Sequence, residues 1–396
     1  MPEVIVVGAG PVGLLMAAEL RRRGVSVEVL EQRAAVGGGS RAIGVHPPVL
    51  AALEESGLTA ELLGHALRVR RGEARSAGQV LGTVRFDQLC TRFPFVATLA
   101  QAATEEVLAA AAPEPTRGVR VTGIRPTAQH VQLHTDSAQP TSAAEPTNAA
   151  EPRAPLVVLA GGGGSRELVY RSPAAHSYPD RYLMTDAEIS EVQIPEDAES
   201  DSDSATAVVH LDAAGVLESF PLPGGRRRFV AGDSPAAAAE PQLQHARLLR
   251  VLAARGITAD GDAALGDTTA FGVRRFVAPR MRNGRLFVIG DAAHEVSPIG
   301  GQGMNLGLLD AAALAPLLTR WIRTGAAPEA ELQQWERARL ASARRAAALA
   351  GLNTRLGRPA PSAVDAVRRS GLRLMLGPGT GRLFTRAYAM GFDAHA

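Results

Sequence analysis

The sequence predicts an α/β fold: a three-layer domain built on a parallel sheet, interleaved with a smaller, mostly antiparallel β domain, and C-terminal helices. Three observations carry this prediction. Residues 4–31 read as strand, glycine turn, helix and strand; residues 172–277 alternate strand candidates with turn residues; and residues 329–396 are mostly helical in pattern. A chain of 396 residues also exceeds the usual size of one domain.

The first unit begins with the apolar strand Val4–Val7, followed by a glycine turn at Gly8–Gly13. Leu14–Arg23 then places its apolar residues on one helical face, and Val25–Leu30 alternates like a half-buried strand. This order is typical of a βαβ unit, in which two parallel strands are joined by a helix.

The turn of this unit has the spacing GxGxxG, formed by Gly8, Gly10 and Gly13. The first glycine permits a tight turn, the second lets backbone approach a pyrophosphate, and the third lets the helix pack on the strand. The helix N-terminus then offers unpaired N–H groups to the phosphates. Glu31, at the end of the second strand, is placed to accept hydrogen bonds from a ribose. The pattern predicts dinucleotide binding in a Rossmann-like domain, without separating FAD from NAD.

Further elements follow in order. We expect helices at Pro47–Leu63 and Gln101–Ala112, with short strands between them around residues 80–86. Residues 137–155, SAQPTSAAEPTNAAEPRAP, contain an imperfect AAEP repeat rich in proline and small polar residues. Such a segment cannot bury enough apolar area to order itself, so we expect an exposed, mobile insertion between two strands.

The second half continues the pattern. Strand candidates at Ala207–Leu211 and Arg228–Ala231, with a helix at Pro241–Ala254, predict a mostly antiparallel sheet. The remaining expected elements are a strand at Leu286–Ile289, helices at Gln302–Trp321 and Glu329–Leu352, a break at Gly357–Pro361 and further C-terminal helices.

Composition excludes several functions. The chain contains no lysine, which rules out a Schiff base or a P-loop lysine. Its single cysteine, Cys90, cannot form an internal disulfide and is expected to be a small buried hydrophobe, and no metal site is expected. The arginine triplets at 21–23 and 226–228 are expected on the solvated surface, without nucleic-acid binding. No apolar run could span a membrane, and MPEVIVVGAG lacks the basic region of a secretory signal, so we expect a cytoplasmic protein.

A second motif, GRLFVIGDAAHEVSPIGGQGMNLGLLDAAAL at residues 284–314, separates the two dinucleotides. Gly290 and Asp291 end its strand, where an acid can bind a polyol. Gly300, Gly301 and Gly303 leave backbone N–H groups bare just before a helix. Those groups, with the helix dipole behind them, would stabilise negative charge on a reduced flavin ring. The motif therefore favours FAD.

This stretch closely resembles the second FAD motif of the class A flavoprotein monooxygenases, the family of p-hydroxybenzoate hydroxylase, and particularly its aromatic polyketide hydroxylase branch. Residues 31–58, EQRAAVGGGSRAIGVHPPVLAALEESGL, resemble the family segment after the ribose acid. Residues 86–108, FDQLCTRFPFVATLAQAATEEVL, resemble the segment whose glutamine, here Gln101, binds the FAD linker. Residues 178–186, YPDRYLMTD, and 271–294 also look like the polyketide branch.

The resemblance implies the site residues. Asp291 would hold the ribityl chain, Arg41 and Pro298 would lie near the flavin ring, and 301–305 would border its pyrimidine edge. The full set expected at the cofactor is Gly8, Gly10, Gly13, Glu31, Arg33, Arg41, Gln101, Gly161, Gly162, Asp291, Pro298, Gly301, Gly303, Met304 and Asn305. No residue is assigned to catalysis. Substrate-side candidates are Tyr182, His210, Phe220, Arg274 and Arg275.

Two residues of the second motif invite a catalytic role but are expected to be structural. His294 would satisfy backbone groups at the turn, because the family's chemistry does not require it as a base. Asp310, inside the following helix, would likewise support the fold.

The resemblance also implies function and domain limits. In the family, NADPH or NADH reduces FAD, dioxygen adds to give a C4a-hydroperoxide, and an oxygen atom passes to an aromatic ring. The implied substrate is an aromatic or polyketide-like small molecule. Open alternatives are a flavin reductase or dehydrogenase that does not activate oxygen, and a flavin-binding accessory protein of a biosynthetic complex. Expected domains are 1–72, 98–170 and 278–328 for FAD, 73–97 and 171–277 for substrate, and 329–396 as a helical region.

One stretch departs from the family pattern. In LAGGGGSRELVYR, residues 159–171, Gly161 occupies the position of the family's aspartate and Gly162 that of its glycine. The lost acid helps organise FAD and the nicotinamide reductant in the family, so reduction by NADPH or NADH is the step in question. The turn from Gly163 to Arg166 would approach the pyrophosphate through backbone and the arginine cation.

Overall fold

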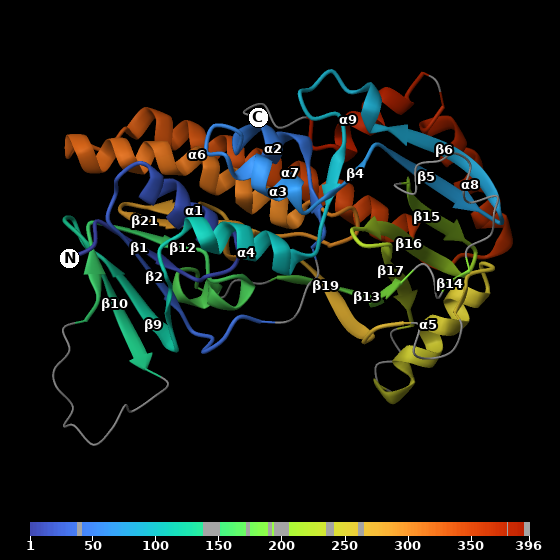
Figure 1. Cartoon of the computed structure of the whole chain (residues 1–396), viewed down its shortest axis with the longest axis horizontal. Helices are drawn as coiled ribbons and strands as arrows, with labels where there is room; N and C mark the ends of the chain where they lie inside the picture. Colours follow the sequence, from blue (N-terminus) through green and yellow to red (C-terminus); the bar gives the residue numbers. More distant parts are fainter. Residues whose placement is uncertain are drawn as a thin grey trace.

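The computed structural model describes residues 1–37, 42–137, 151–171, 175–188, 192–193, 206–234, 241–259, 265–377 and 379–391. Arg41 and most of the expected insertion, residues 138–150, lie outside the described residues. The chain forms an elongated molecule with a parallel sheet toward one end and a large antiparallel sheet toward the other, bridged by long helices (Figure 1).

The first sheet is parallel apart from one edge strand. Its order is β20-β21-β12-β1-β2-β8, and only β20 pairs antiparallel with its neighbour. β1 (Val4–Val7) is fully covered because it lies in register between β2 (Val27–Glu31) and β12 (Leu156–Leu159). Strands buried on both faces are continuous apolar runs, which both β1 and β12 are. The remaining members are β8 (Thr116–Arg117), β20 (Arg282–Asn283) and β21 (Leu286–Val288).

Helices and a small sheet enclose this parallel sheet. α1 (Pro11–Arg22) packs against α4 (Gln101–Ala111) and α6 (Gly303–Thr324), and α6 packs against α7 (Glu329–Leu356). The small sheet has three strands and lies beside β1 and β2, at the lower left of Figure 1. It consists of β9 (Val119–Pro126), β10 (Val131–Ser137) and β11 (Arg153–Ala154).

The expected helix at Pro47–Leu63 is two helices. α2 (Pro47–Ala52) and α3 (Leu58–Gly64) are separated at Gly57, whose φ of 79° lies in the left-handed region and ends regular helix. A second three-stranded sheet holds this segment in place and consists of β3 (Gly44–Val45), β7 (Val96–Thr98) and β4 (Leu67–Val69).

The large sheet has the order β22-β19-β13-β17-β16-β15-β5-β6, with β15 and β5 as its one parallel pair. The expectation of a mostly antiparallel sheet is therefore confirmed, and the chain reaches it in three separate passes, at β5–β6, at β13–β19 and at β22. Its strands are β5 (Arg71–Ser76), β6 (Gln79–Arg85), β13 (His176–Glu188), β15 (Thr206–Asp212), β16 (Gly215–Leu222), β17 (Arg226–Asp233), β19 (Thr269–Val277) and β22 (His294–Glu295).

One face of the large sheet is covered by α5 (Gln244–Ala253), whose Leu248 and Leu252 are buried against Leu217 and Phe229. This leaves the opposite face for other contacts. A two-stranded sheet of β14 (Val192–Gln193) and β18 (Thr258–Ala259) lies beside α5.

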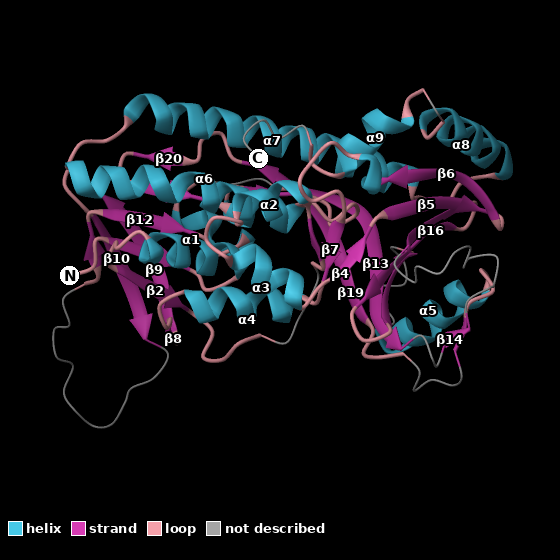
Figure 2. Cartoon of the chain, turned by 45° about the horizontal axis from the view of Figure 1, so that its top comes forward, coloured by secondary structure: helices cyan, strands magenta, loops and turns pink. Residues whose placement is uncertain are grey.

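The C-terminal helices connect the two ends of the molecule. α7 extends along the parallel-sheet end toward the large sheet, and α8 (Ser362–Met375) and α9 (Gly381–Tyr388) pack against β6 (Figure 2). No helix in the part of the chain that the structure describes is both long and apolar enough to cross a membrane.

Two expectations from composition are wrong. Cys90 is exposed rather than buried. Arg227 and Arg228 are buried, because the pairing of β13 with β17 places Asp186 opposite Arg228 and the guanidinium binds both carboxylate oxygens, at 2.6 and 2.8 Å. Arg227 instead donates to the Ser219 hydroxyl at 2.8 Å. Cross-strand partners, an acid for Arg228 and hydroxyl and carbonyl oxygens for Arg227, make burial of these charges tolerable, and the local sequence does not reveal these partners.

Candidate active site

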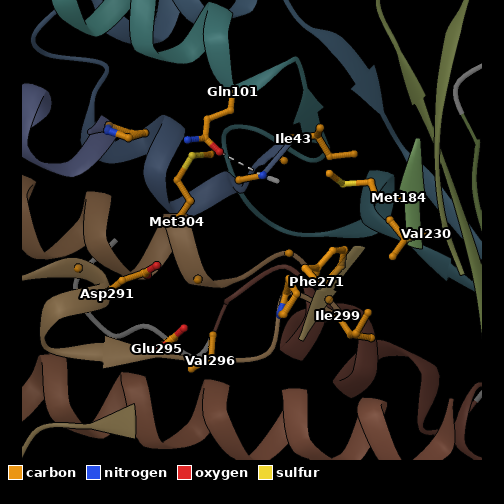
Figure 3. Close-up of a pocket in the computed structure, with 18 of the residues that line it drawn as sticks. Ile43, Gln101, Met184, Val230, Phe271, Asp291, Glu295, Val296, Ile299 and Met304 are labelled. Carbon is orange, nitrogen blue, oxygen red and sulfur yellow. Dashed lines mark hydrogen bonds between the residues drawn. The ribbon is translucent and has the colours of Figure 1, made fainter. Parts of the chain in front are cut away.

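A cavity of about 1530 Å³ lies between the two large sheets. In Figure 3, Gln101, Met304 and Asp291 lie toward one side of it, and Met184, Val230 and Phe271 toward the other. The C-terminal helices complete the wall through residues such as Asn353 and Tyr388. One space therefore connects the glycine motifs with the uncovered face of the antiparallel sheet.

The first glycine turn fits a closely approaching ligand. Gly8 has a φ of 108°, and a Cβ there would lie 2.6 Å from the Ala160 carbonyl oxygen. A Cβ at Gly13 would lie 1.9 Å from the Gly8 oxygen, so α1 rests directly on the turn. No side chain caps the first turn of α1, which leaves backbone N–H groups facing the region lined by Gly10. Such a helix start is suited to a phosphate.

Glu31 is fixed beside this turn. Its Oε2 accepts from the Ala9 N–H at 2.7 Å, and its Oε1 accepts from the backbone N–H of Arg33 at 2.8 Å and from Nε of the same residue at 3.0 Å. Burial alone would raise the pKa of Glu31, but these hydrogen bonds and the Arg33 charge lower it below its usual range. The carboxylate on the cavity wall is therefore ionised and held in one orientation.

The second glycine turn precedes α6. Gly300 and Gly301 have φ values of 100° and 66°, which only glycine adopts readily. Asn305 holds the turn, since its Nδ2 donates to the Gly301 and Gly44 carbonyls at 3.1 and 2.8 Å. Its Oδ1 accepts from the His46 N–H at 2.8 Å. Asn305 is thus a scaffold behind the cavity wall rather than part of it.

His46 lies against the same turn and was not expected from the sequence. The side chain is buried on the cavity wall, and no described group hydrogen-bonds to its Nδ1. Burial lowers the pKa of His46 to about 4, against the influence of backbone groups of Tyr388 and Gly301. The imidazole is therefore neutral, and a buried polar atom without a partner beside a cavity suits a ligand that supplies one.

Asp310 anchors the Gly290–Asp291 turn from behind. Its buried carboxylate accepts from the Gly290 N–H at 3.1 Å, from His294 Nε2 at 2.6 Å and from Arg339 Nε at 2.9 Å. Burial alone would raise the pKa of Asp310, but the His294 and Arg339 charges lower it. Burial would lower the pKa of His294, and the Asp310 carboxylate raises it. His294 is thus structural as expected, but it binds a side chain rather than backbone.

The glycine run at 161–164 lies on the cavity wall, and a Cβ at Gly161 would lie 2.9 Å from both Cβ and Oγ of Ser165. Arg166 is occupied elsewhere. Its guanidinium donates to Glu295 Oε2 at 2.6 Å and to the Asp291 carbonyl at 2.7 Å, and lies 4.5 Å from the centre of the Phe276 ring. The expectation that this cation approaches a pyrophosphate is therefore wrong.

The opposite wall is the uncovered face of the large sheet. Side chains that share this face include Met184, Val209, Val216, Phe220, Val230 and Phe271, and all line the cavity. Beside them lie Asp186, which is paired with Arg228, and a second acid, Glu218, which is 5% exposed. The sequence interpretation missed it, although an acid inside the apolar run GVLESFPL was a usable signal.

Apart from Arg41, which lies outside the described residues, the predicted residues divide into two groups. Those on the cavity wall are Gly8, Gly10, Glu31, Arg33, Gln101, Gly161, Gly162, Asp291, Pro298, Gly301, Gly303 and Met304, together with Phe220 and Arg274. Gln101 also accepts a hydrogen bond from the Ala42 N–H at 3.3 Å, drawn in Figure 3. Residues away from the described wall are Gly13, Asn305, Tyr182, His210 and Arg275. Tyr182 is instead buried and stacked on Phe271.

Known proteins share both sequence and fold with this chain. It is 32% identical over 349 residues to 6-methylpretetramide 4-monooxygenase of Streptomyces rimosus, covering 83% of this chain and 57% of that protein. It is 31% identical over 320 residues to rifampicin monooxygenase of Streptomyces venezuelae, covering 78% and 62%. The chain thus spans about three fifths of the length of these relatives.

Solved structures agree. Anhydrotetracycline hydroxylase of Streptomyces rimosus superposes with a TM-score of 0.76 at 26% identity, over 98% of this chain and 75% of that one. p-Nitrophenol 4-monooxygenase of Pseudomonas putida superposes with a TM-score of 0.83 at 24% identity, over 99% and 98%, which shows a shared fold. The family model described as an FAD binding domain matches residues 1–350, and the chain therefore belongs to this FAD-binding family.

Proposed function

We propose that this protein is an FAD-dependent monooxygenase that hydroxylates an aromatic or polyketide-like small molecule, with NADPH or NADH as reductant. The observation that carries the proposal is the single cavity that joins two glycine turns to an apolar sheet face. The relatives named above are monooxygenases or hydroxylases by name, two of them for 6-methylpretetramide and anhydrotetracycline.

In this proposal the parallel-sheet side holds the cofactor. Backbone N–H groups at Gly10 and the start of α1 receive the pyrophosphate, and Glu31 accepts hydrogen bonds from the ribose. Asp291 binds the ribityl hydroxyls. The Gly301 N–H already donates to the Pro298 carbonyl at 2.9 Å, so the backbone N–H groups offered to the flavin are those at Gly303, where α6 begins without a side-chain cap. When bound, FAD supplies the oxygen-activating chemistry, which no side chain of the protein provides on its own.

The remaining tasks fall to the protein. The apolar face around Val209, Val230 and Phe271 binds a flat ring system and excludes water from it. Helix positive ends at α1 and α6 hold negative charge that develops on the cofactor side. The Asp310 network keeps the turn at Asp291 in one position while substrate enters and leaves.

The test is a coupled assay on purified protein with FAD, NADPH or NADH, and heavy-isotope dioxygen against a panel of polycyclic phenols. We expect a yellow protein and a product that gains one labelled oxygen atom. Reductant oxidation that gives only hydrogen peroxide across the panel would contradict hydroxylation. A colourless protein that FAD cannot reconstitute would contradict every flavin-based function.

A further inference from the structure

Glu218 is placed at the centre of the apolar sheet face. On β16 its direct cross-strand neighbours are Val209 of β15 and Val230 of β17. Along its own strand, Val216 and Phe220 occupy the same face. All five residues line the cavity. The carboxyl group of Glu218 therefore has apolar side chains at both directly opposed positions and at both same-face positions of its own strand.

The carboxyl group has no partner among the described residues. It is 5% exposed, and no described group forms a hydrogen bond or ion pair with it. An ionised carboxylate buried without a partner is costly, so the group stays protonated instead. Burial raises the pKa of Glu218 to about 8. In the neutral form it carries one O–H donor.

Charged groups nearby do not change this assignment. Arg228, which shares the cavity wall on β17, already binds both oxygens of Asp186 on β13. On β15, His210 occupies an alternate position of the strand, so it lies on the other face, and burial lowers its pKa to about 4.

β4 and β7 also pack against β16, the Val216 N–H donates to the Gly357 carbonyl after α7 at 2.9 Å, and Arg255 donates to the Gly215 carbonyl at 2.7 Å. Arg68 of β4 stacks over the Phe95 ring, and β7 contains no titratable side chain. Two tyrosines lie close enough to Glu218 that its ionised form would raise their pKa values. Burial raises the pKa of Tyr388 to about 12, and that of Tyr182 above its usual range. Neither tyrosine titrates near neutral pH.

We propose that Glu218 is a substrate-orienting residue that donates a hydrogen bond from its neutral carboxyl group to a carbonyl oxygen of an aromatic substrate. The inference rests on the proposed function, because it places the substrate ring against this sheet face. A single donor on an apolar surface fixes one edge of a flat ring and sets which carbon faces the cofactor. The apolar side chains around Glu218 also disfavour carboxylate-bearing rings, whose charge would lose its hydration there.

The test measures binding to FAD-loaded protein, and therefore does not depend on turnover. The probes are 1-tetralone, whose carbonyl only accepts hydrogen bonds, and tetralin, the same ring system without oxygen. Dissociation constants come from calorimetric titration at about pH 6.5 and about pH 9.5, on either side of the raised pKa. The variants are Glu218→Gln, which keeps a donor but does not titrate, and Glu218→Leu, which removes it.

We expect wild-type protein to bind 1-tetralone about tenfold more tightly at the lower pH, because only the protonated acid donates. Glu218→Gln should bind 1-tetralone equally at both pH values. Glu218→Leu should lose about tenfold at the lower pH while its tetralin affinity is unchanged or higher. Undetectable 1-tetralone binding, pH-independent binding by wild type, or equal losses for both probes would overturn the inference. Failure of hydroxylation with this binding pattern intact would instead refute the proposed function alone.

Discussion

The two walls of the cavity differ in the source of their polarity. On the parallel-sheet wall, polarity comes from the uncapped helix starts at Gly10 and Gly303 and from carboxylates already fixed by hydrogen bonds, as at Glu31. On the antiparallel-sheet wall, apolar side chains surround one carboxyl group without a partner, that of Glu218. The first wall is preorganised for a charged ligand, and the second keeps one carboxyl group available for a neutral one.

The largest expected effect is a loss of stability when the buried Asp310 network behind the first wall is broken. Asp310→Asn leaves Arg339 and His294 without their counter-charge in a fully buried site. Breaking a buried ion pair from one side should lower the free energy of unfolding by about 3–5 kcal/mol. Urea denaturation checks this. Glu329→Gln, which breaks an exposed pair with Arg282, is the control and should cost less than about 1 kcal/mol. Equal costs in the two variants would show that the buried network does not stabilise this wall.

The second prediction concerns close approach of backbone at the first turn. Gly8→Ala introduces a Cβ 2.6 Å from the Ala160 oxygen at a φ of 108°. The turn must shift, so we expect FAD affinity to fall at least about a hundredfold, measured by flavin titration of the apoprotein. Gly24→Ala is the matched control, because its φ is 76° but no atom lies within 4 Å of the new Cβ. If both variants retain flavin, close approach at Gly8 does not matter to binding.

The sequence reveals the first wall far better than the second, for a physical reason. The GxGxxG turn, Glu31 and the Gly300–Gly301 turn are local patterns, each contained in one strand, turn and helix. The apolar surroundings of Glu218 come from Val209 and Val230, which neighbouring strands place beside it. No local pattern contains that pairing.

The errors have the same origin. The sequence pattern predicts Arg227 and Arg228 on the solvated surface, but the pairing of β13 with β17 buries them. The sequence pattern predicts that Arg166 approaches a phosphate, but the segment after Asp291 places Glu295 beside it as an ion-pair partner. His46, too, becomes a cavity residue only because Asn305, far along the chain, binds its backbone. Side chains whose role depends on a distant partner are those that sequence patterns miss.

A third prediction tests the unpaired acid of the second wall through stability. The pKa of Glu218 is about 8 in the folded protein against 4.5 for a free side chain, so the folded state binds more protons between these values. The stabilisation is complete below about pH 4.5 and is lost as pH rises through about 8. Glu218→Gln should remove this loss, giving a Tm at least about 2 °C above wild type near pH 9. Parallel Tm profiles of the two proteins across this range would contradict a buried neutral acid.

The smallest expected effect adds charge to the first wall. Gly161→Asp restores the acid that the resemblance places there, and a carboxylate would stabilise the positive charge that a nicotinamide gains on giving up hydride. Its Cβ would lie 2.9 Å from Cβ and Oγ of Ser165, so this serine must give way. We therefore expect flavin reduction by NADPH or NADH to quicken about twofold in Gly161→Asp, and about fivefold when Ser165→Gly is added, in stopped-flow absorbance.

The control for this comparison is Gly164→Asp, because no atom lies within 4 Å of a Cβ at that position on the same wall. It adds an equal charge without occupying the position of the family acid, so its reduction rate should stay near that of wild type. A similar gain in Gly164→Asp would show that added negative charge anywhere on the wall suffices. An unchanged or lower rate in both Gly161→Asp variants would mean that reduction does not depend on an acid at this turn. The backbone-lined wall would then be sufficient for reduction in its neutral form.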